Sequence, residues 1–174
     1  MTMFARFDPH ARGTAAEVAV RVAGESDLTR CADLACRRNG GDQDLWYSRL
    51  AVDQADPERL LVVAEIDGTV VGHACAGWQH FDRHLAHNVK DGWYLTGVIV
   101  EPDSRRRGVG RHLVQARLDW LSTRADRAWY FASAQNEASL QLHREFGFSE
   151  VTRTFEVPGV TFTGGVGVLC VRAL

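Results

Sequence analysis

The chain has 174 residues, a length that suits one domain with a sizeable core and leaves little room for a second. Hydrophobic residues make up 45% of the sequence and charged residues 24%, as in ordinary soluble globular proteins. The formal net charge of −2 argues against a general nucleic-acid binder, because such proteins are usually clearly basic. The longest apolar runs are far too short to span a membrane. We therefore expect neither a nucleic-acid partner nor a membrane partner.

Residues 1–14 are expected to be a loose lead-in and residues 15–174 a single domain. The lead-in lacks the apolar stretch of a secretory signal peptide. The four cysteines show no Cys-x-x-Cys spacing, and Cys75 and Cys170 lie inside apolar runs, where a free thiol behaves as a small hydrophobe. A reducing cytoplasm is the simplest interpretation.

The first half of the chain predicts a strand, two helices and a β-hairpin. Alternating valines are typical of the strand, and Ser26 or Asp27 is placed to cap the helix that follows. Asp67-Gly68 stands between two apolar runs and is a strong hairpin signal. The predicted elements are a strand over 17–23, a helix from about 27 to 38, a helical piece over 45–52, and strands over 60–66 and 70–78.

The second half predicts two further strands that alternate with helices, and then a closing antiparallel pair. Gly97 indicates a bulge or a close approach of the backbone inside a strand. Asn136 is placed to cap the last helix and Gly147 to end it. The predicted elements are a strand over 92–100, a helix from about 109, a strand over 128–133, a helix over 136–146, and strands over 148–157 and 166–171. The helix from about 109 is expected to bury a stripe of Val109, Leu113, Ala116 and Trp120.

The most informative stretch is residues 98–113, where a β-branched run stops at a proline and an arginine- and glycine-rich turn leads into a helix. Glycines at a helix start let the backbone approach a ligand, and the first N–H groups of a helix have no internal partner and carry partial positive charge. Arginines add charge that is not lost near neutral pH. The stretch therefore predicts a phosphate-binding cradle.

Two familiar phosphate-binding motifs do not fit this cradle. A P-loop needs a Lys-Ser/Thr pair that is absent, and the dinucleotide fingerprint that begins at Gly108 and Gly110 has Leu113 in its third glycine position. What remains is Arg105-x-x-Gly108-x-Gly110 after a Val-Ile-Val-x-Pro strand. This pattern resembles the coenzyme A signature of the GNAT superfamily of N-acetyltransferases, Arg/Gln-x-x-Gly-x-Gly/Ala.

A second motif strengthens the resemblance, the segment Asn136-Glu-Ala-Ser-Leu-Gln-Leu-His143-Arg-Glu-Phe-Gly147-Phe148. It is similar to the family's Asn-x-x-Ala/Ser-x-x-x-Tyr/His-x-x-x-Gly-Phe, and phosphinothricin-type acetyltransferases share its histidine. Residues seven apart on a helix lie on nearly one face, about 10.5 Å apart along the axis, so Asn136 and His143 can face one cleft. The resemblance implies that Asn136 contacts the pantetheine arm or a nearby water. It also implies that the residue at the position of His143, usually tyrosine, protonates the departing thiolate.

The resemblance covers roughly residues 17–172 and implies the GNAT fold, an α/β (α+β) mixed sheet with helices on both faces. In that fold two parallel strands splay apart to admit acetyl-CoA, the implied co-substrate. Backbone N–H groups over 98–100 would then pair with the pantetheine amide and polarise the thioester carbonyl, while those over 106–111 would hold the pyrophosphate. The cofactor-binding residues implied are Val98, Ile99, Val100, Arg105, Arg106, Arg107, Gly108, Val109, Gly110, Arg111 and Asn136.

The general acid and the general base are less well defined. Histidine has an ordinary pKa of about 6.5, so a protonated fraction survives near neutral pH, and we take His143 as the candidate general acid. A surface or packing histidine is the alternative. The positions where some family members carry a glutamate base hold Tyr94 and, approximately, Phe131. The remaining candidate bases, acting directly or through water, are Asp82, Asp91, His80 and His84.

The leading hypothesis is a cytoplasmic, acetyl-CoA-dependent N-acetyltransferase that acts on a primary amine of a small molecule. Residues 38–52, residues 79–91 and the C-terminal strands would choose the acceptor. The alternatives are acetylation of protein N-termini or lysines, and a non-catalytic acyl-CoA sensor. The family also leaves open a homodimer formed through the C-terminal strands.

The histidines of the connection over 79–91 are a separate question. The spacing of His80, His84 and His87 would place three imidazoles together on a helix, a possible metal site, but we expect a loop there. An acceptor-lining or solvent-exposed role is favoured, and no metal is predicted.

Overall fold

The computed structural model describes residues 17–174, so the lead-in expected over 1–14 lies outside the described residues. Within this range the elements follow one another in the predicted order. The strands are β1 (Ala19–Val22), β2 (Arg59–Ile66), β3 (Thr69–Gln79), β4 (Gly92–Val100), β5 (Arg127–Ser133), β6 (Ser149–Thr152) and β7 (Gly167–Ala173). The α-helices are α1 (Leu28–Asn39), α2 (Gln43–Ala55), α3 (Val109–Leu121) and α4 (Glu137–Glu145).

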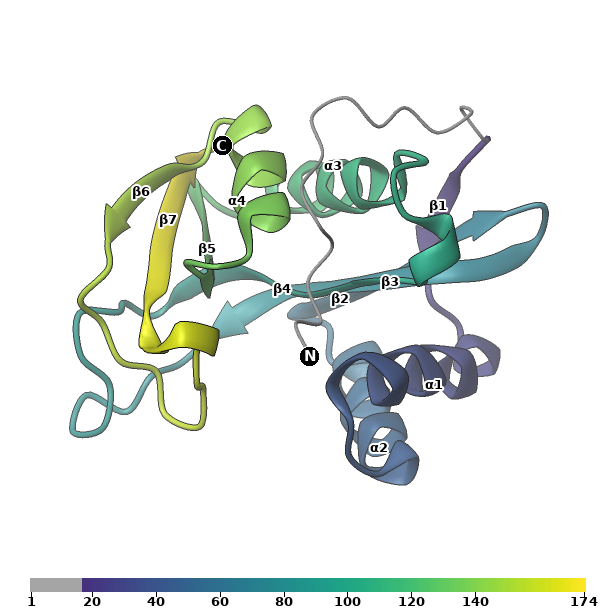
Figure 1. Cartoon of the computed structure of the whole chain (residues 1–174), viewed down its shortest axis with the longest axis horizontal. Coiled ribbons are helices and arrows are strands. Elements are labelled where there is room, and N and C mark those ends of the chain that lie inside the picture. The colour runs from purple at the N-terminus through teal and green to yellow at the C-terminus, as the bar shows by residue number, and fades with distance from the viewer. Residues whose placement is uncertain (1–16) are drawn as a thin grey trace.

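One mixed sheet forms the middle layer, with the strand order β1-β2-β3-β4-β5-β7-β6. Neighbouring strands are antiparallel except β4 and β5, which run parallel. Helices α1 and α2 lie on one face of the sheet, and α3 and α4 lie on the other (Figure 1). The predicted mixed α/β sheet with helices on both faces is therefore confirmed.

β4 is paired with β3 along most of its length but meets β5 at a single backbone pairing, Tyr94 with Trp129. The register between β3 and β4 shifts between His73 and Cys75. Gly97, beside this shift, adopts a φ of +58°, in the left-handed region that favours glycine. The bulge predicted at Gly97 is confirmed, and after it β4 and β5 separate towards their C-terminal ends.

Each face of the sheet carries an apolar core. Leu113 and Leu118 of α3 pack with residues of β2, β3 and β5 on one face, and Cys31 of α1 packs with residues of β2 and β3 on the other. The stripe predicted for α3 needs one correction. Ala116 and Trp120 are only half-buried, whereas Arg117 is fully buried.

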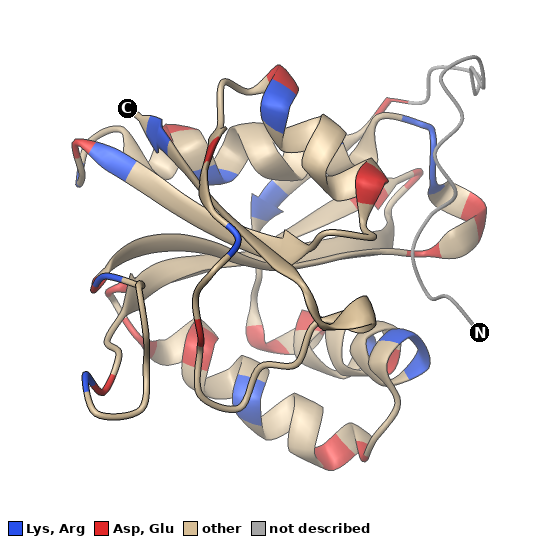
Figure 2. Cartoon of the chain, turned by 60° about the vertical axis from the view of Figure 1, so that its left-hand side comes forward, with Lys and Arg blue, Asp and Glu red and all other residues tan. Residues whose placement is uncertain are grey.

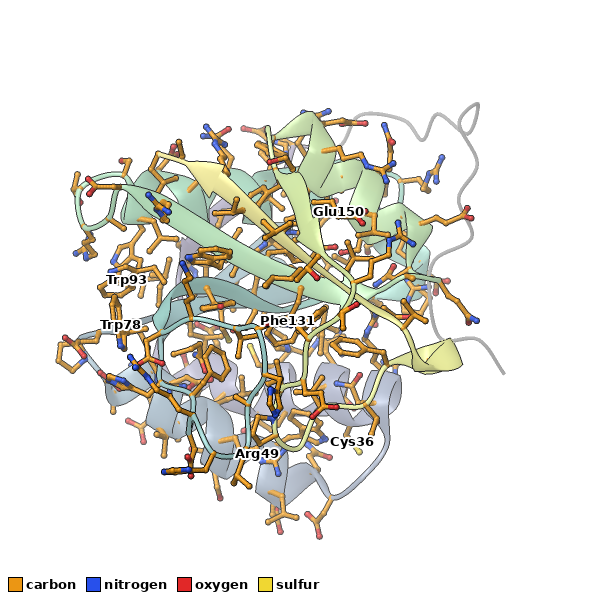
Figure 3. All side chains as sticks on the ribbon, turned by 90° about the vertical axis from the view of Figure 1, so that its left-hand side faces the viewer. Cys36, Arg49, Trp78, Trp93, Phe131 and Glu150 are labelled. Atoms are coloured by element: carbon orange, nitrogen blue, oxygen red, sulfur yellow. The ribbon has the colours of Figure 1, made fainter. Side chains whose placement is uncertain are left out.

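A third, aromatic cluster lies around Tyr94, Trp129 and Phe131. It is on the sheet face opposite α3, because Tyr130, between Trp129 and Phe131, packs with α3. Phe131 is labelled in Figure 3. The loops over 80–91 and 153–166 cover it with further aromatic side chains. The two loops are joined by a pair of backbone hydrogen bonds between His87 and Glu156, with N···O distances of 3.1 and 2.9 Å. They therefore close together over this part of the sheet.

The cap predicted for α1 is not made by a side chain. Asp27 occupies the N-cap position, but its carboxylate makes no capping bond to the helix. It instead accepts a hydrogen bond from the N–H of Gly24 at 2.8 Å and pairs with Arg21 at 2.6 Å. The guanidinium of Arg21 and the N–H of Gly24 therefore take the place of the helix N–H groups that the Asp27 carboxylate was expected to bind.

Two other boundaries differ from the prediction. Helix α2 is longer than 45–52 at both ends. It begins after Asp42, whose carboxylate accepts a hydrogen bond from the N–H of Asp44 at 2.7 Å, and it continues to Ala55. The strand expected over 148–157 is only Ser149–Thr152, because the chain then leaves the sheet and Phe155 enters the aromatic cluster.

Acidic and basic residues are interspersed over the helices and loops in the view of Figure 2. No helix within residues 17–174 is long and apolar enough to cross a lipid bilayer.

Candidate functional site

A cleft with a volume of about 640 Å³ opens between the start of α3, one side of α4 and the end of β4. It lies where β4 has separated from β5, so the strands themselves leave room for a ligand. Every residue that the sequence analysis assigned to the cofactor lines this cleft, except Ile99 and Arg107, and His143 lines it as well.

The two exceptions have plain structural reasons. Ile99 is buried in the core on the α1 side of the sheet, while its neighbours Val98 and Val100 line the cleft, as the alternation of a strand requires. Arg107 buries its Nε, which has no hydrogen-bond partner among residues 17–174, and its side chain is not part of the lining.

The turn between β4 and α3 has the backbone shape of an anion cradle. Arg106 has a φ of +65° and Gly108 a φ of +85°, and Gly108 is the N-cap of α3. The Nε of Arg105 donates to the carbonyl of Val100 at 3.3 Å, which ties the turn to the end of β4. Because Gly108, Val109 and Gly110 line the cleft, the unpartnered first N–H groups of α3 lie at its wall.

Gly110 has a second reason to be glycine. A Cβ at this position would lie 3.2 Å from Cδ2 of Leu142 in α4. The absence of a side chain at Gly110 therefore lets the start of α3 approach the middle of α4 closely. Both helices can then line the same cleft.

The cleft is rich in positive charge. Arg38, Arg105, Arg106 and Arg111 line it, and the carboxylate that lines it, Glu145, forms an ion pair with Arg111. An anionic ligand would enter a site with an excess of cations.

Arg38 is a lining residue that the sequence analysis assigned to the acceptor region instead. It reaches the cleft from the last turn of α1, and no ion pair to it is formed within residues 17–174. Burial, and then the positive charge of Arg105, lower the pKa of Arg38. The sequence signal was weak, because an arginine in the last turn of a helix is already favoured by the helix dipole.

Asn136 and His143 both face the cleft from α4, as their spacing of seven predicts. Asn136 also caps the helix, since its Oδ1 accepts a hydrogen bond from the N–H of Ser139 at 3.3 Å. The capping role and the lining role therefore coexist.

His143 is held rigidly and is almost fully buried, with 2% of its surface exposed. Its ring stacks on Tyr130 with centroids 3.8 Å apart, and its Nδ1–H donates to the carbonyl of Ser139 at 2.8 Å. Its Nε2 is buried and has no hydrogen-bond partner in the described chain. The neutral imidazole therefore presents a lone pair at Nε2.

The protonation state of His143 differs from the one expected from an ordinary histidine. Burial, and then the charge of Arg117, lower the pKa of His143 to about 3. The imidazole is thus neutral near pH 7 in the free protein, and the protonated fraction assumed from the ordinary pKa is absent.

None of the four candidate bases lines the cleft. Asp91 accepts a hydrogen bond from the N–H of Phe81 at 2.9 Å and contacts His80 at 3.2 Å; the first interaction and then the second lower its pKa. Asp82 accepts from the N–H of His84 at 2.8 Å. These carboxylates order their own loop.

The positions that some family members give to a glutamate base carry no titratable group of use here. Tyr94 is fully buried, its hydroxyl donates to the carbonyl of Lys90 at 2.8 Å, and burial raises its pKa to about 12. Phe131 belongs to the aromatic cluster.

The histidines and cysteines add no metal site within residues 17–174. His80, His84 and His87 lie in the loop over 80–91, and no group of three His, Cys, Asp or Glu side chains in this range is arranged to hold a metal ion. All four cysteines are free thiols, and burial raises the pKa of Cys31 and of Cys75 to about 12.

Comparisons with known proteins agree with this geometry. Residues 27–148 match the model of the acetyltransferase (GNAT) family. The chain is 28% identical over 126 residues to the N-alpha-acetyltransferase RimI of Mycobacterium tuberculosis, which covers 72% of this chain and 75% of that protein. It is 33% identical over 90 residues to the L-amino acid N-acyltransferase MnaT of Escherichia coli, which covers 51% of this chain and 49% of that protein.

The first curated relatives are matched over 40 to 75% of their own lengths. Among solved structures, YncA of Salmonella typhimurium with its cofactor acetyl-CoA superposes with a TM-score of 0.70 at 21% identity, over 90% of this chain and 94% of that one. The fold, the cradle and the family model agree. The chain belongs to the acetyltransferase (GNAT) family, whose members transfer an acetyl group from acetyl-CoA to an acceptor.

Proposed function

We propose that this protein transfers the acetyl group of acetyl-CoA to the primary amine of a small molecule. The observation that carries the proposal is the cleft, which has a cradle of left-handed backbone and helix N–H groups at one end and the unpaired edge of β4 beside it. The residues present fit a long anionic thioester carrier. Arg38, Arg105 and Arg106 supply cations at the cradle, and Val98 and Val100 supply an edge for amide pairing.

Acetyl-CoA supplies an activated thioester, and the protein must polarise its carbonyl and manage one proton. The amine nitrogen forms a bond to the carbonyl carbon, the carbon–sulfur bond breaks, and a proton passes from nitrogen to sulfur. In this proposal, backbone N–H groups of β4 after the bulge polarise the carbonyl. Among residues 17–174, the lining carboxylate is that of Glu145, and it is paired with Arg111 instead of being free to act as a base.

We propose that His143 serves the leaving thiolate. Because Nδ1–H is committed to Ser139, proton exchange is confined to Nε2. A thiolate that develops beside Nε2 favours the imidazolium, since opposite charge raises the pKa of a histidine. His143 then takes the proton that the amine releases and passes it to sulfur.

A small acceptor is favoured by the joined loops on the opposite face of the sheet. The hydrogen bonds between His87 and Glu156, and the bond at 2.9 Å from Nδ2 of Asn88 to the carbonyl of Thr154, close the region over β4, β5 and β7. These loops do not line the cleft itself, but they would restrict an acceptor that reaches the sheet beside Tyr94 and Phe131, which suits a compact amine better than an extended polypeptide. The similarity to MnaT points the same way.

Acetylation of protein N-termini is the second candidate, because RimI is matched over more of this chain than MnaT is. A cytoplasmic location belongs to the proposal, in keeping with four free thiols, and a homodimer through the C-terminal strands stays a prediction.

The test is release of free thiol from acetyl-CoA across a panel of amino acids, polyamines, aminoglycosides and peptides with free N-termini. We expect turnover with a small amine, and His143→Ala should lower kcat on that amine more than it raises the KM for acetyl-CoA. Turnover with peptides alone would overturn the small-molecule acceptor. Calorimetric binding of acetyl-CoA without turnover on any amine would favour a sensor, and an unchanged kcat in His143→Ala would remove His143 from the chemistry.

A further inference from the structure

Arg117 is a fully buried cation in the middle of α3, with 0% of its surface exposed. None of the ion pairs within residues 17–174 includes it. Removing a guanidinium from water without a carboxylate partner is costly. The cost of this burial indicates a role that requires the charge.

Within the part of the chain that the structure describes, the guanidinium of Arg117 is bound by main-chain carbonyls alone. Its Nε donates to Leu113 one turn earlier at 3.0 Å, and its Nη1 donates to Cys75 at 3.2 Å and to Thr96 at 3.3 Å. Its Nη2 is buried and has no hydrogen-bond partner in the described chain. The positive charge of Arg117 is therefore stabilised by carbonyl dipoles and is not neutralised by a carboxylate.

The two strand carbonyls that bind Arg117 lie beside the β-bulge of β4. Cys75 of β3 and Thr96 of β4 are paired residues, next to the register shift and immediately before Gly97. Beyond this point β4 is not paired with β5, and Val98 and Val100 line the cleft. Arg117 thus ties α3 to both strands at the position where β4 turns away.

The charge of Arg117 also reaches the cleft. It is one of the causes that lower the pKa of His143, whose ring lines the cleft, after the larger effect of burial. Burial lowers the pKa of Arg117 itself to about 9, so the guanidinium stays protonated near neutral pH. Near neutral pH a positive charge therefore stands close to the end of the cleft where His143 lies.

We propose that Arg117 is a positioning residue for acetyl transfer, which holds the bulge of β4 so that the following backbone N–H groups meet the thioester carbonyl and places a buried positive charge beside the developing negative charge. This inference rests on the proposed seating of the thioester along β4. Its physical basis is that donors aimed at a developing charge act only when they are held in place beforehand.

The test compares Arg117→Met, which keeps the length and helix preference of the side chain, with Arg117→Lys, which keeps the charge but loses the forked donor. Arg124→Met is the matched control, because Arg124 lies just after α3, stacks on Trp120 at 4.2 Å and is exposed. We expect Arg117→Met to lower kcat by about 10- to 100-fold with less than about a threefold change in the KM for acetyl-CoA. Arg117→Lys should recover part of kcat, and Arg124→Met should retain it.

A second measurement does not depend on turnover. Acetyl-CoA labelled with ¹³C at the carbonyl is bound to each variant, and the carbonyl stretch is read by isotope-edited infrared spectroscopy. We expect the wild-type protein to lower the stretching frequency relative to free acetyl-CoA and Arg117→Met to return it towards the free value.

An infrared band in Arg117→Met that equals the wild-type band, or a kcat within about twofold of wild type, would overturn the role of Arg117. Should Arg117→Met fail to fold, the same comparison is made with Arg117→Lys, in which an unchanged band and an unchanged kcat overturn it. Failure of every small amine in the panel counts against the proposed acceptor alone, because the infrared comparison needs no acceptor.

Discussion

At the residue scale, Arg38 carries the sharpest prediction about the ligand. It lines the cleft, forms no ion pair with any residue from 17 to 174, and lies close enough to Arg105 for that charge to lower its pKa, so a bound anion would relieve the repulsion. We expect Arg38→Gln to weaken binding of acetyl-CoA by about tenfold, the size of one charge-assisted hydrogen bond. Isothermal titration calorimetry at two salt concentrations measures the change.

The adjacent arginine supplies the control for that experiment. Arg37 is exposed, pairs with Asp33 and Glu101, and does not line the cleft. Arg37→Gln should bind acetyl-CoA within about twofold of wild type. Equal losses in both variants would show a general effect of net charge and remove Arg38 from the site.

Single residues were predictable from the sequence where a motif fixed their place. The alternation of β4 brings Val98 and Val100 to the cleft, and the spacing of seven brings Asn136 and His143 there. The burial of Arg117 was not predictable, because a charged residue within an apolar stripe is normally assigned to solvent. The lowered pKa of His143 depends on tertiary burial, which no local pattern reveals.

At the element scale, the bulge of β4 is the feature to perturb. Gly97 has a φ of +58°, and a Cβ there would lie 3.8 Å from Sγ of Cys75, so Gly97→Ala adds backbone strain without a clash. We expect a loss of about 1 kcal/mol in the free energy of unfolding, and a fall in kcat of at least about tenfold as the edge after the bulge is displaced. Chemical denaturation and the thiol-release assay measure the two effects.

A turn glycine separates strain from catalysis. Gly68 has a φ of +74° in the hairpin between β2 and β3, and nothing lies within 4 Å of a Cβ built there. Gly68→Ala should therefore cost a similar free energy of unfolding and leave kcat unchanged. If both variants lose the same activity, the geometry of the bulge has no special part in the reaction.

The sequence predicts the ends of helices and strands correctly where a glycine marks the turn that follows them. Asp67-Gly68 forms the hairpin turn, and Gly147, with a φ of +82°, follows the end of α4, as predicted. The strand after Gly147 was overestimated because its apolar residues serve two different layers. Phe155 packs on Phe131 in the aromatic cluster, and neither periodicity nor composition distinguishes that from a strand.

At the scale of the whole molecule, buried histidines set a pH dependence of stability. Burial lowers the pKa of His73 to about 4 and contributes most to the lowering of His143 to about 3. Both values lie below the ordinary value near 6.5, so the unfolded chain takes up these protons first as the pH falls. The stabilisation is complete above about pH 6.5, and on the order of 2 kcal/mol per histidine is lost by pH 4.5.

Denaturant unfolding at pH 7.5 and pH 4.5 measures this loss. His73→Leu should make the free energy of unfolding less dependent on pH, because the imidazole is removed. The number of protons taken up on unfolding should fall by about one. His84→Leu, at an exposed position in the loop over 80–91, should leave the wild-type dependence in place. An unaltered dependence in His73→Leu would mean that His73 takes up its proton equally in both states.

The sheet consists of two parts, β1–β4 and β5–β7, which are joined by the single backbone pairing of Tyr94 with Trp129. Along an ordinary sheet a ladder of main-chain bonds fixes the angle between neighbouring strands, but here most rungs of that ladder are missing on one side of β4. A ligand whose amide groups paired with this edge of β4 would supply the missing backbone hydrogen bonds. Ligand binding along this edge would therefore also restrict the angle between β4 and β5.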